Sequence, residues 1–169
     1  DYYKHQDKVI ETISDIIDEG YHISLDLYGG AYKPAFHKLR NTLDKIGKNN
    51  LNIRYLGPTN FTKIHKVYQS ADLFLYASTC ENLPLILLEA MASGLPILSS
   101  NSDPMIEVLG RSTLLFNPRD TSELKRKLCL FLEDHNLRQN SANETHLLSK
   151  KYSWKNCSHE TFAYLKLLI

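Results

Sequence analysis

Residues 80–96 read CENLPLILLEAMASGLP, and this stretch decides the fold predicted for the chain of 169 residues. An apolar helix is expected over residues 83–93, after a short polar loop. Pro84 is favoured in a first helical turn, because its missing N–H would be unpaired there anyway. The free amides of that turn, expected at Leu85 and Ile86, point back toward the loop. With the helix dipole they make a binding site for an anion such as a diphosphate.

Strand and helix signals alternate on both sides of this stretch. Strands are expected at residues 21–28, 51–56, 72–76, 95–99 and 112–116. Helices are expected at residues 5–19, 33–48, 61–69, 103–109, 121–133, 136–149 and 154–169. This alternation predicts an α/β fold, a Rossmann-like doubly wound parallel sheet with helices on both faces. Ligands of such sheets bind beyond the carboxyl ends of the strands.

The composition narrows the class of protein. A net charge of +1 argues against a general nucleic-acid-binding protein. The longest apolar runs, such as residues 83–88, are too short to span a bilayer. Three widely spaced cysteines, Cys80, Cys129 and Cys157, suggest reduced thiols in a cytoplasmic protein. We expect no metal site, because no CxxC or HxxxH pair occurs.

Three polar residues of the decisive stretch have two interpretations each. Glu89 lies in the apolar run LILLEAMA, where a buried carboxylate needs a partner. It can accept two hydroxyls, as from a ribose diol, or it lies on an exposed stripe of the helix. Glu81 lies in the loop after a strand, where binding groups gather, or it is a solvated loop charge. Asn82 is either a ligand contact or the helix N-cap.

The spacing of the two glutamates resembles a known signature. Glu81 and Glu89, with seven residues between them, precede AMASGLP (residues 90–96), as in the family four retaining glycosyltransferases, or glycosyl transferases group 1. Four flanking segments resemble the family in the same order: SLDLYGGAY (24–32), NIRYLG (52–57), VYQSADLFLYAS (67–78) and STLLFNPRDTSELKRKL (112–128). The resemblance implies the carboxyl-terminal, donor-binding half of a two-domain GT-B enzyme.

The resemblance also implies roles for single residues. Glu81 would contact hydroxyls of the donor sugar, and Glu89 would bind the ribose. Lys4, otherwise a solvated amine near the terminus, would neutralise the leaving diphosphate, together with an arginine expected before Asp1. The further donor-binding residues implied are Gly29, Gly30, Tyr55, Asn82, Leu83, Leu85 and Ile86. Gly29 and Gly30 can also form a plain turn. Pro84 departs from the family's usual glycine and removes one amide.

The activity implied is transfer of a sugar, with retention, from a nucleoside-diphosphate sugar to an acceptor hydroxyl, without a metal or other cofactor. The expected setting is bacterial polysaccharide or lipopolysaccharide synthesis, in the cytoplasm or at the inner face of the cell membrane. The acceptor would be a lipid-linked oligosaccharide. The alternatives are a GT-B sugar-nucleotide epimerase or phosphorylase domain, and a non-catalytic nucleotide-binding module.

The domain organisation follows from the same resemblance. Residues 1–169 are expected to form one nucleotide-sugar-binding domain, whose partner is an amino-terminal acceptor domain of the same protein. That domain and a first strand of the sheet would precede Asp1, because the chain opens in a loop and a helix. The isolated domain would then be nearly inactive. The last helix, rich in aromatic residues, can pack elsewhere than on the sheet.

Overall fold

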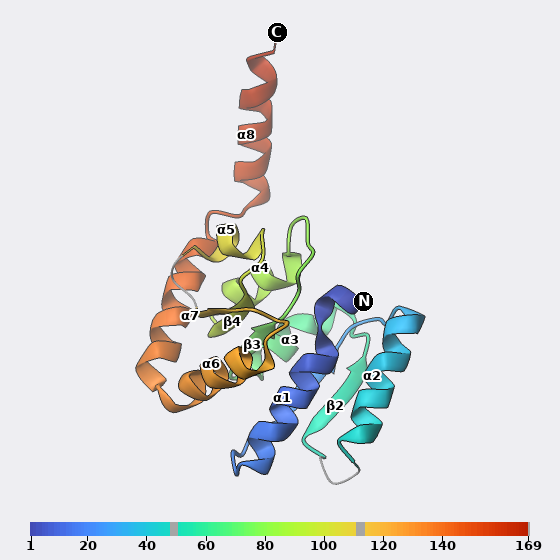
Figure 1. The fold of residues 1–169 in the computed structure, drawn as a ribbon. Coiled ribbons are helices and arrows are strands. Elements are labelled where there is room, and N and C mark those ends of the chain that lie inside the picture. The colour runs from blue at the N-terminus through green and yellow to red at the C-terminus, as the bar shows by residue number, and fades with distance from the viewer. Residues whose placement is uncertain (48–50, 111–113, 169) are drawn as a thin grey trace.

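The fold is known from a computed structural model that describes residues 1–47, 51–110 and 114–168. Strands alternate with helices along the chain, as predicted (Figure 1). The strands are β1 (Leu25–Tyr28), β2 (Ile53–Gly57), β3 (Phe74–Tyr76), β4 (Ile97–Ser100) and β5 (Leu114–Phe116). The helices are η1 (Tyr2–Lys4), α1 (Gln6–Asp18), α2 (Lys33–Lys45), η2 (Phe61–Lys63), α3 (Ile64–Gln69), α4 (Leu85–Ala92), α5 (Met105–Leu109), α6 (Thr121–Glu133), α7 (His135–Ser149) and α8 (Trp154–Lys166).

All strand pairs of the described residues are parallel, but they form two separate sheets rather than the single sheet expected. These two sheets are called the first and the second ladder below. β1 pairs with β2, with Leu25 opposite Ile53. β3, β4 and β5 form a second sheet with β4 at its centre. No hydrogen-bonded pairing joins β1 to β3 in the described chain. Because parallel strands all point the same way within each sheet, the loops that follow them gather at one edge.

One apolar core joins the two ladders. Ile53 of β2 and Leu98 of β4 belong to the same buried cluster as Ile10 and Ile16 of α1. Phe131 of α6 is fully buried in that cluster as well. Helix α1 packs against both α2 and α6, so it lies across the two ladders (Figure 1). The two ladders therefore share a continuous hydrophobic core.

A second buried cluster covers the other face of the three-stranded sheet. It combines Ile97 of β4 with Leu87 and Met91 of α4 and Met105 of α5. Successive residues of a strand point to opposite faces, which explains why Ile97 and Leu98 lie in different clusters. Helices on both faces of this sheet confirm the predicted α/β architecture.

Several predicted element boundaries shift in the structure. The first strand begins at Leu25 rather than Tyr21. The Tyr21 amide donates instead to the carbonyl of Ile16, which closes the end of α1. The N-cap of α6 is Asp120, whose carboxylate accepts from the amides of Ser122 and Glu123. Predicted positions 48, 112, 113 and 169 lie outside the described residues.

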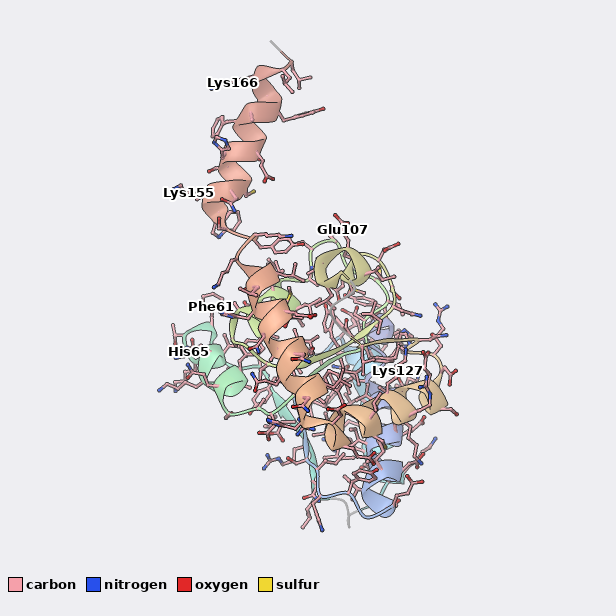
Figure 2. All side chains as sticks on the ribbon, turned by 90° about the vertical axis from the view of Figure 1, so that its left-hand side faces the viewer. Phe61, His65, Glu107, Lys127, Lys155 and Lys166 are labelled. Atoms are coloured by element: carbon pink, nitrogen blue, oxygen red, sulfur yellow. The ribbon has the colours of Figure 1, made fainter. Side chains whose placement is uncertain are left out.

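Helix α8 projects away from the rest of the molecule (Figures 1 and 2). None of its described residues is buried, and the Trp154 side chain is 87% exposed. Its other exposed large apolar residues are Phe162, Tyr164 and Leu165, followed by Leu167 and Leu168. Lys155 and Lys166 mark its two ends in Figure 2. No helix in the described part of the chain is long and apolar enough to cross a membrane.

Candidate functional site

The amino-terminal turn η1 docks on the loop that follows β3. The Thr79 amide donates to the carbonyl oxygen of Tyr3 at 2.9 Å. The Nε2 atom of His5 and the Oγ1 atom of Thr79 form a further hydrogen bond of 3.0 Å. These contacts hold Lys4 against the part of the loop that carries Glu81. Two residues that lie far apart in the sequence therefore meet at the carboxyl edge of the sheet.

Lys4 and Glu81 form an ion pair between Nζ and Oε1. The Ser78 hydroxyl donates to the same carboxylate oxygen at 2.5 Å, and Lys4 Nζ also donates to the Tyr76 hydroxyl at 3.4 Å. The side chains of Lys4 and Glu81 are 25% and 15% exposed. The alternatives of a solvated amine and a solvated loop charge are therefore wrong for this pair.

The surroundings of Glu81 favour its ionised form. Burial alone would raise the pKa of this carboxyl. Hydrogen bonds from Lys4, Ser78 and Tyr76 outweigh burial and hold the pKa of Glu81 below its ordinary value. Burial, followed by the hydrogen bond to Glu81, raises the pKa of the Tyr76 phenol. The site thus presents a fixed carboxylate beside a partly buried ammonium.

The lowered pKa of Glu81 predicts a pH-dependent contribution to stability. A depressed carboxyl pKa stabilises the fold above the unfolded value of 4.5. That contribution is lost as the pH falls from this value through the folded pKa. We expect Glu81→Gln to be less stable than the native chain at pH 7, with the difference shrinking below about pH 4.5. Urea unfolding at pH 7 and at pH 3.5 measures it, and a difference that grows on acidification would contradict the assignment.

Helix α4 begins two residues later than predicted, and its first turn differs from the prediction. Pro84 occupies the N-cap position with φ −78° and ψ 77°, so Asn82 is not the cap. These angles are those of an inverse γ-turn, in which the Leu85 amide donates to the Leu83 carbonyl at 2.9 Å. The prediction of a free amide at Leu85 is therefore wrong, because Pro84 directs this amide into the turn.

The start of α4 nevertheless remains an open surface. The side chains of Leu83, Leu85 and Ile86 are all exposed. Within the described residues, no acceptor is hydrogen-bonded to the Ile86 amide. Asn82 is exposed as well. The anion site expected at this helix start is thus reduced to the Ile86 amide and the loop that precedes it.

Glu89 has a specific partner that the sequence did not reveal. Its Oε2 atom accepts a hydrogen bond of 2.9 Å from the hydroxyl of Tyr68, which lies in α3. The glutamate is half-buried rather than on an exposed stripe, so that interpretation is wrong. Tyr68, Tyr76 and Ser78 were all missed as contributors to the site. Their signal is weak, since the segment VYQSADLFLYAS (67–78) mixes several polar and apolar side chains and no spacing sets these three hydroxyls apart.

Gly29 and Tyr55 are brought together at the end of the first ladder. The Tyr55 hydroxyl donates to the Gly29 carbonyl at 2.8 Å. Gly29 has φ 128°, which other residues rarely adopt, and its amide donates to the carbonyl of Gly57. Gly30 follows in the same loop. Both ladders therefore contribute predicted residues at their carboxyl ends, although no hydrogen bond joins these two groups within the described chain.

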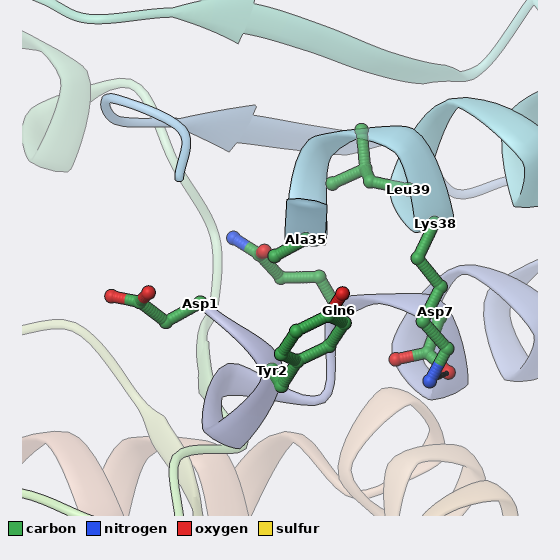
Figure 3. A pocket seen from close by; sticks show the side chains of 7 residues that line it. All are labelled: Asp1, Tyr2, Gln6, Asp7, Ala35, Lys38 and Leu39. Atoms are coloured by element: carbon green, nitrogen blue, oxygen red, sulfur yellow. Dashed lines mark ion pairs between the residues drawn. The ribbon is translucent and has the colours of Figure 1, made fainter. Parts of the chain in front are cut away.

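Two surface hollows lie away from these residues. The first lies between the start of α1 and α2, where Lys38 and Asp7 form an ion pair of 2.7 Å (Figure 3). The second lies beside Gly94 and His146, at the end of α4 opposite to its start. Neither hollow is lined by a predicted site residue. The described residues also contain no group of three His, Cys, Asp or Glu side chains suited to a metal ion.

Two curated proteins that resemble the chain are transferases. The O-antigen chain mannosyltransferase B of Escherichia coli is 33% identical over 116 residues, which cover 69% of this chain and 30% of that protein. A sulfoquinovosyl transferase of Arabidopsis thaliana is 26% identical over 155 residues, covering 88% of this chain and 29% of that protein. The chain thus spans about a third of the length of these relatives.

Solved structures show the same fold. HepE of Anabaena, solved in complex with UDP and glucose, superposes with a TM-score of 0.85 at 19% identity, covering 98% of this chain and 45% of that one. The C-terminal domain of a glycosyl transferase group 1 protein of Francisella tularensis gives 0.78 at 21% identity, covering 89% and 80%. Residues 1–146 match the family described as glycosyl transferases group 1. The chain therefore belongs to this family, as a carboxyl-terminal domain with one half of the GT-B fold.

Proposed function

We propose that the chain is the donor-binding domain of an enzyme that transfers a sugar, with retention, from a nucleoside-diphosphate sugar to an acceptor hydroxyl. The observation that carries this proposal is the contact between Lys4 and Glu81 at the carboxyl edge of the sheet. In this proposal the ammonium of Lys4 recognises the diphosphate of the donor, and the carboxylate of Glu81 recognises its sugar. The presence of UDP and glucose in the complex of Anabaena HepE supports a donor of this class.

The ion pair gives each partner a separate task. The ammonium of Lys4 moves from the Glu81 carboxylate to the leaving diphosphate and stabilises the charge that develops there. Glu81 stays in place because Ser78 and Tyr76 also hold it, and its carboxylate accepts hydroxyls of the sugar. Because Lys4 moves when the donor binds, both charges are in place before the reaction and act without reorganisation during it, which makes them a large contribution to catalysis.

The nucleotide extends along the same edge. Glu89 accepts the ribose hydroxyls, and the Ile86 amide with the loop at Asn82 and Leu83 faces the diphosphate. Leu85 contributes its exposed side chain to this surface rather than its amide. Gly29 and Gly30 form the donor-side loop opposite, next to the Tyr55 hydroxyl. No metal or other cofactor takes part in this proposal.

An amino-terminal domain of the same protein completes the enzyme in this proposal. Two observations support such a partner. Strands β1 and β3 each have a side without a strand partner in the described chain, so a preceding strand can pair between them. Helix α8 exposes a row of large apolar side chains that folded domains normally bury. The acceptor site belongs to this second domain, and the isolated chain transfers sugar poorly.

One of the relatives supports a biological setting for the proposed enzyme. The match to an O-antigen chain mannosyltransferase supports a role in bacterial polysaccharide or lipopolysaccharide synthesis. In that setting we propose that the acceptor is a lipid-linked oligosaccharide and that the enzyme acts in the cytoplasm, at the inner face of the cell membrane.

Two assays on the full-length protein test the proposed reaction. UDP- and GDP-sugars are incubated with lipid-linked acceptor, and the anomeric configuration of the product is read by NMR. The same donors are incubated without acceptor to detect epimerisation. We expect transfer with retention and no epimer. Epimerisation without transfer, or donor binding without any turnover, would overturn the proposal in favour of the two alternative classes.

A further inference from the structure

We propose that Tyr68 is a positioning residue that fixes the Glu89 carboxylate for recognition of the ribose. This inference rests on the proposed donor site and adds to it a residue from a different helix. Tyr68 does not touch the ligand in this proposal. It acts on ribose through Glu89, the nearer of the two acceptors of its hydroxyl, since the other, the Ile86 carbonyl, lies at 3.3 Å.

The geometry assigns different tasks to the two oxygens of Glu89. Oε2 accepts the Tyr68 hydroxyl at 2.9 Å. Within the described residues, no donor is hydrogen-bonded to Oε1. A carboxylate tied through one oxygen keeps the other in a single orientation, and that oxygen remains available to a diol. The hydrogen bond also offsets part of the free-energy cost of half-burying a carboxylate in an apolar helix.

The position of Tyr68 is set by the core rather than by the site. Its side chain is only 7% exposed and belongs to the buried cluster around α4. Its ring stands edge-on to Phe74 of β3, with the ring centroids 5.9 Å apart. Burial, followed by the hydrogen bond to Glu89, raises the pKa of the phenol, so the hydroxyl keeps its proton and can donate. A rigid donor therefore holds the carboxylate in one orientation.

Substitution by phenylalanine removes this donor while keeping the ring. Tyr68→Phe leaves Glu89 in place, but its carboxylate can then rotate. The expected effect is a loss of selectivity for ribose rather than a loss of folding. A purely structural role would instead weaken binding of ribose and deoxyribose ligands by the same factor, which makes the ratio of the two affinities the decisive quantity.

The experiment measures binding of UDP, GDP and their 2′-deoxy analogues to the 169-residue chain by calorimetry. Of UDP and GDP, the one that binds more tightly should bind to the native chain about tenfold better than its own 2′-deoxy analogue. This factor corresponds to the free energy of one hydrogen bond to a charged group. Tyr68→Phe should reduce this preference to about twofold, and Glu89→Ala should abolish it. The double variant should resemble Glu89→Ala alone, because the two residues act as one unit.

Tyr21→Phe is the matched control. It also removes a tyrosine hydroxyl that donates to a glutamate, Glu133, but at the far end of α1 and α6. Its ribose preference should equal that of the native chain. A full preference in Tyr68→Phe, with none in Glu89→Ala, would overturn the inference alone. A preference that survives in Glu89→Ala would also remove the ribose assignment. A native chain that binds neither UDP nor GDP would overturn the donor site and the inference together.

Discussion

Replacing Glu81 by alanine is expected to lower the rate of sugar transfer by the full-length protein by about 100- to 1,000-fold, the usual effect of removing one preorganised polar group from a transition state. The affinity for the free nucleoside diphosphate should not fall. Glu81 contacts the sugar in the proposed site, and its removal frees Lys4 for the diphosphate. Steady-state kinetics with the donor and calorimetry with UDP or GDP measure the two quantities.

Glu11→Ala is the matched control for this variant. It removes the carboxylate of another lysine–glutamate pair, since Lys8 and Glu11 lie 3.0 Å apart on the surface of α1. Exposed pairs of this kind contribute little, so transfer by the control should remain close to native. A Glu81→Ala enzyme that transfers normally, or one that loses nucleotide affinity and rate in the same proportion, would argue against the division of tasks between Lys4 and Glu81.

Replacing Phe131 by alanine is expected to reduce the free energy of unfolding by about 3–5 kcal/mol, the usual cost of truncating a buried phenylalanine. Phe131 is fully buried in the cluster that joins the two ladders of strands. A loss of this size is a large part of the stability of an ordinary domain. Guanidinium unfolding of the 169-residue chain measures the change.

Phe162→Ala makes the same truncation on α8, where the phenylalanine is 64% exposed. Its effect in the isolated chain should stay within about 0.5 kcal/mol, because no buried contact is lost. Similar losses for the two variants would show that α8 packs on the domain in solution, contrary to the structure. Separate unfolding steps in the native chain would contradict a core shared by both ladders.

Much of the architecture could be predicted from local patterns. The order of strands and helices and the helix expected at residues 5–19 were readable, since each depends on neighbouring residues. The start of α4 could not be predicted correctly. Pro84 was expected inside the first turn, whereas the γ-turn that it forms moves the helix start to Leu85.

The candidate site was only partly predictable, because its residues meet partners from distant parts of the chain. Glu81 and Glu89 were candidates from the sequence pattern, but their roles, and the choice of Lys4, came from the family resemblance. Their protein partners could not be read from spacing, because Lys4 and Glu81 meet only when η1 docks on the loop after β3. Tyr68 reaches Glu89 from another helix in the same way. Contacts between distant segments depend on packing, and a single hydroxyl such as that of Tyr68 in α3 carries little local signal.

The most direct test of the donor site is amide chemical-shift mapping of the isotope-labelled 169-residue chain during titration with UDP and GDP. The largest shifts should fall at Gly29 and Gly30, in the loop from Ser78 to Ile86, and at Glu89. The amide of Lys4 should shift with them, because its side chain would move toward the diphosphate. Shifts confined to the hollow beside Gly94 and His146, or to the hollow between Asp7 and Lys38, would contradict a donor site at the carboxyl edge of the sheet.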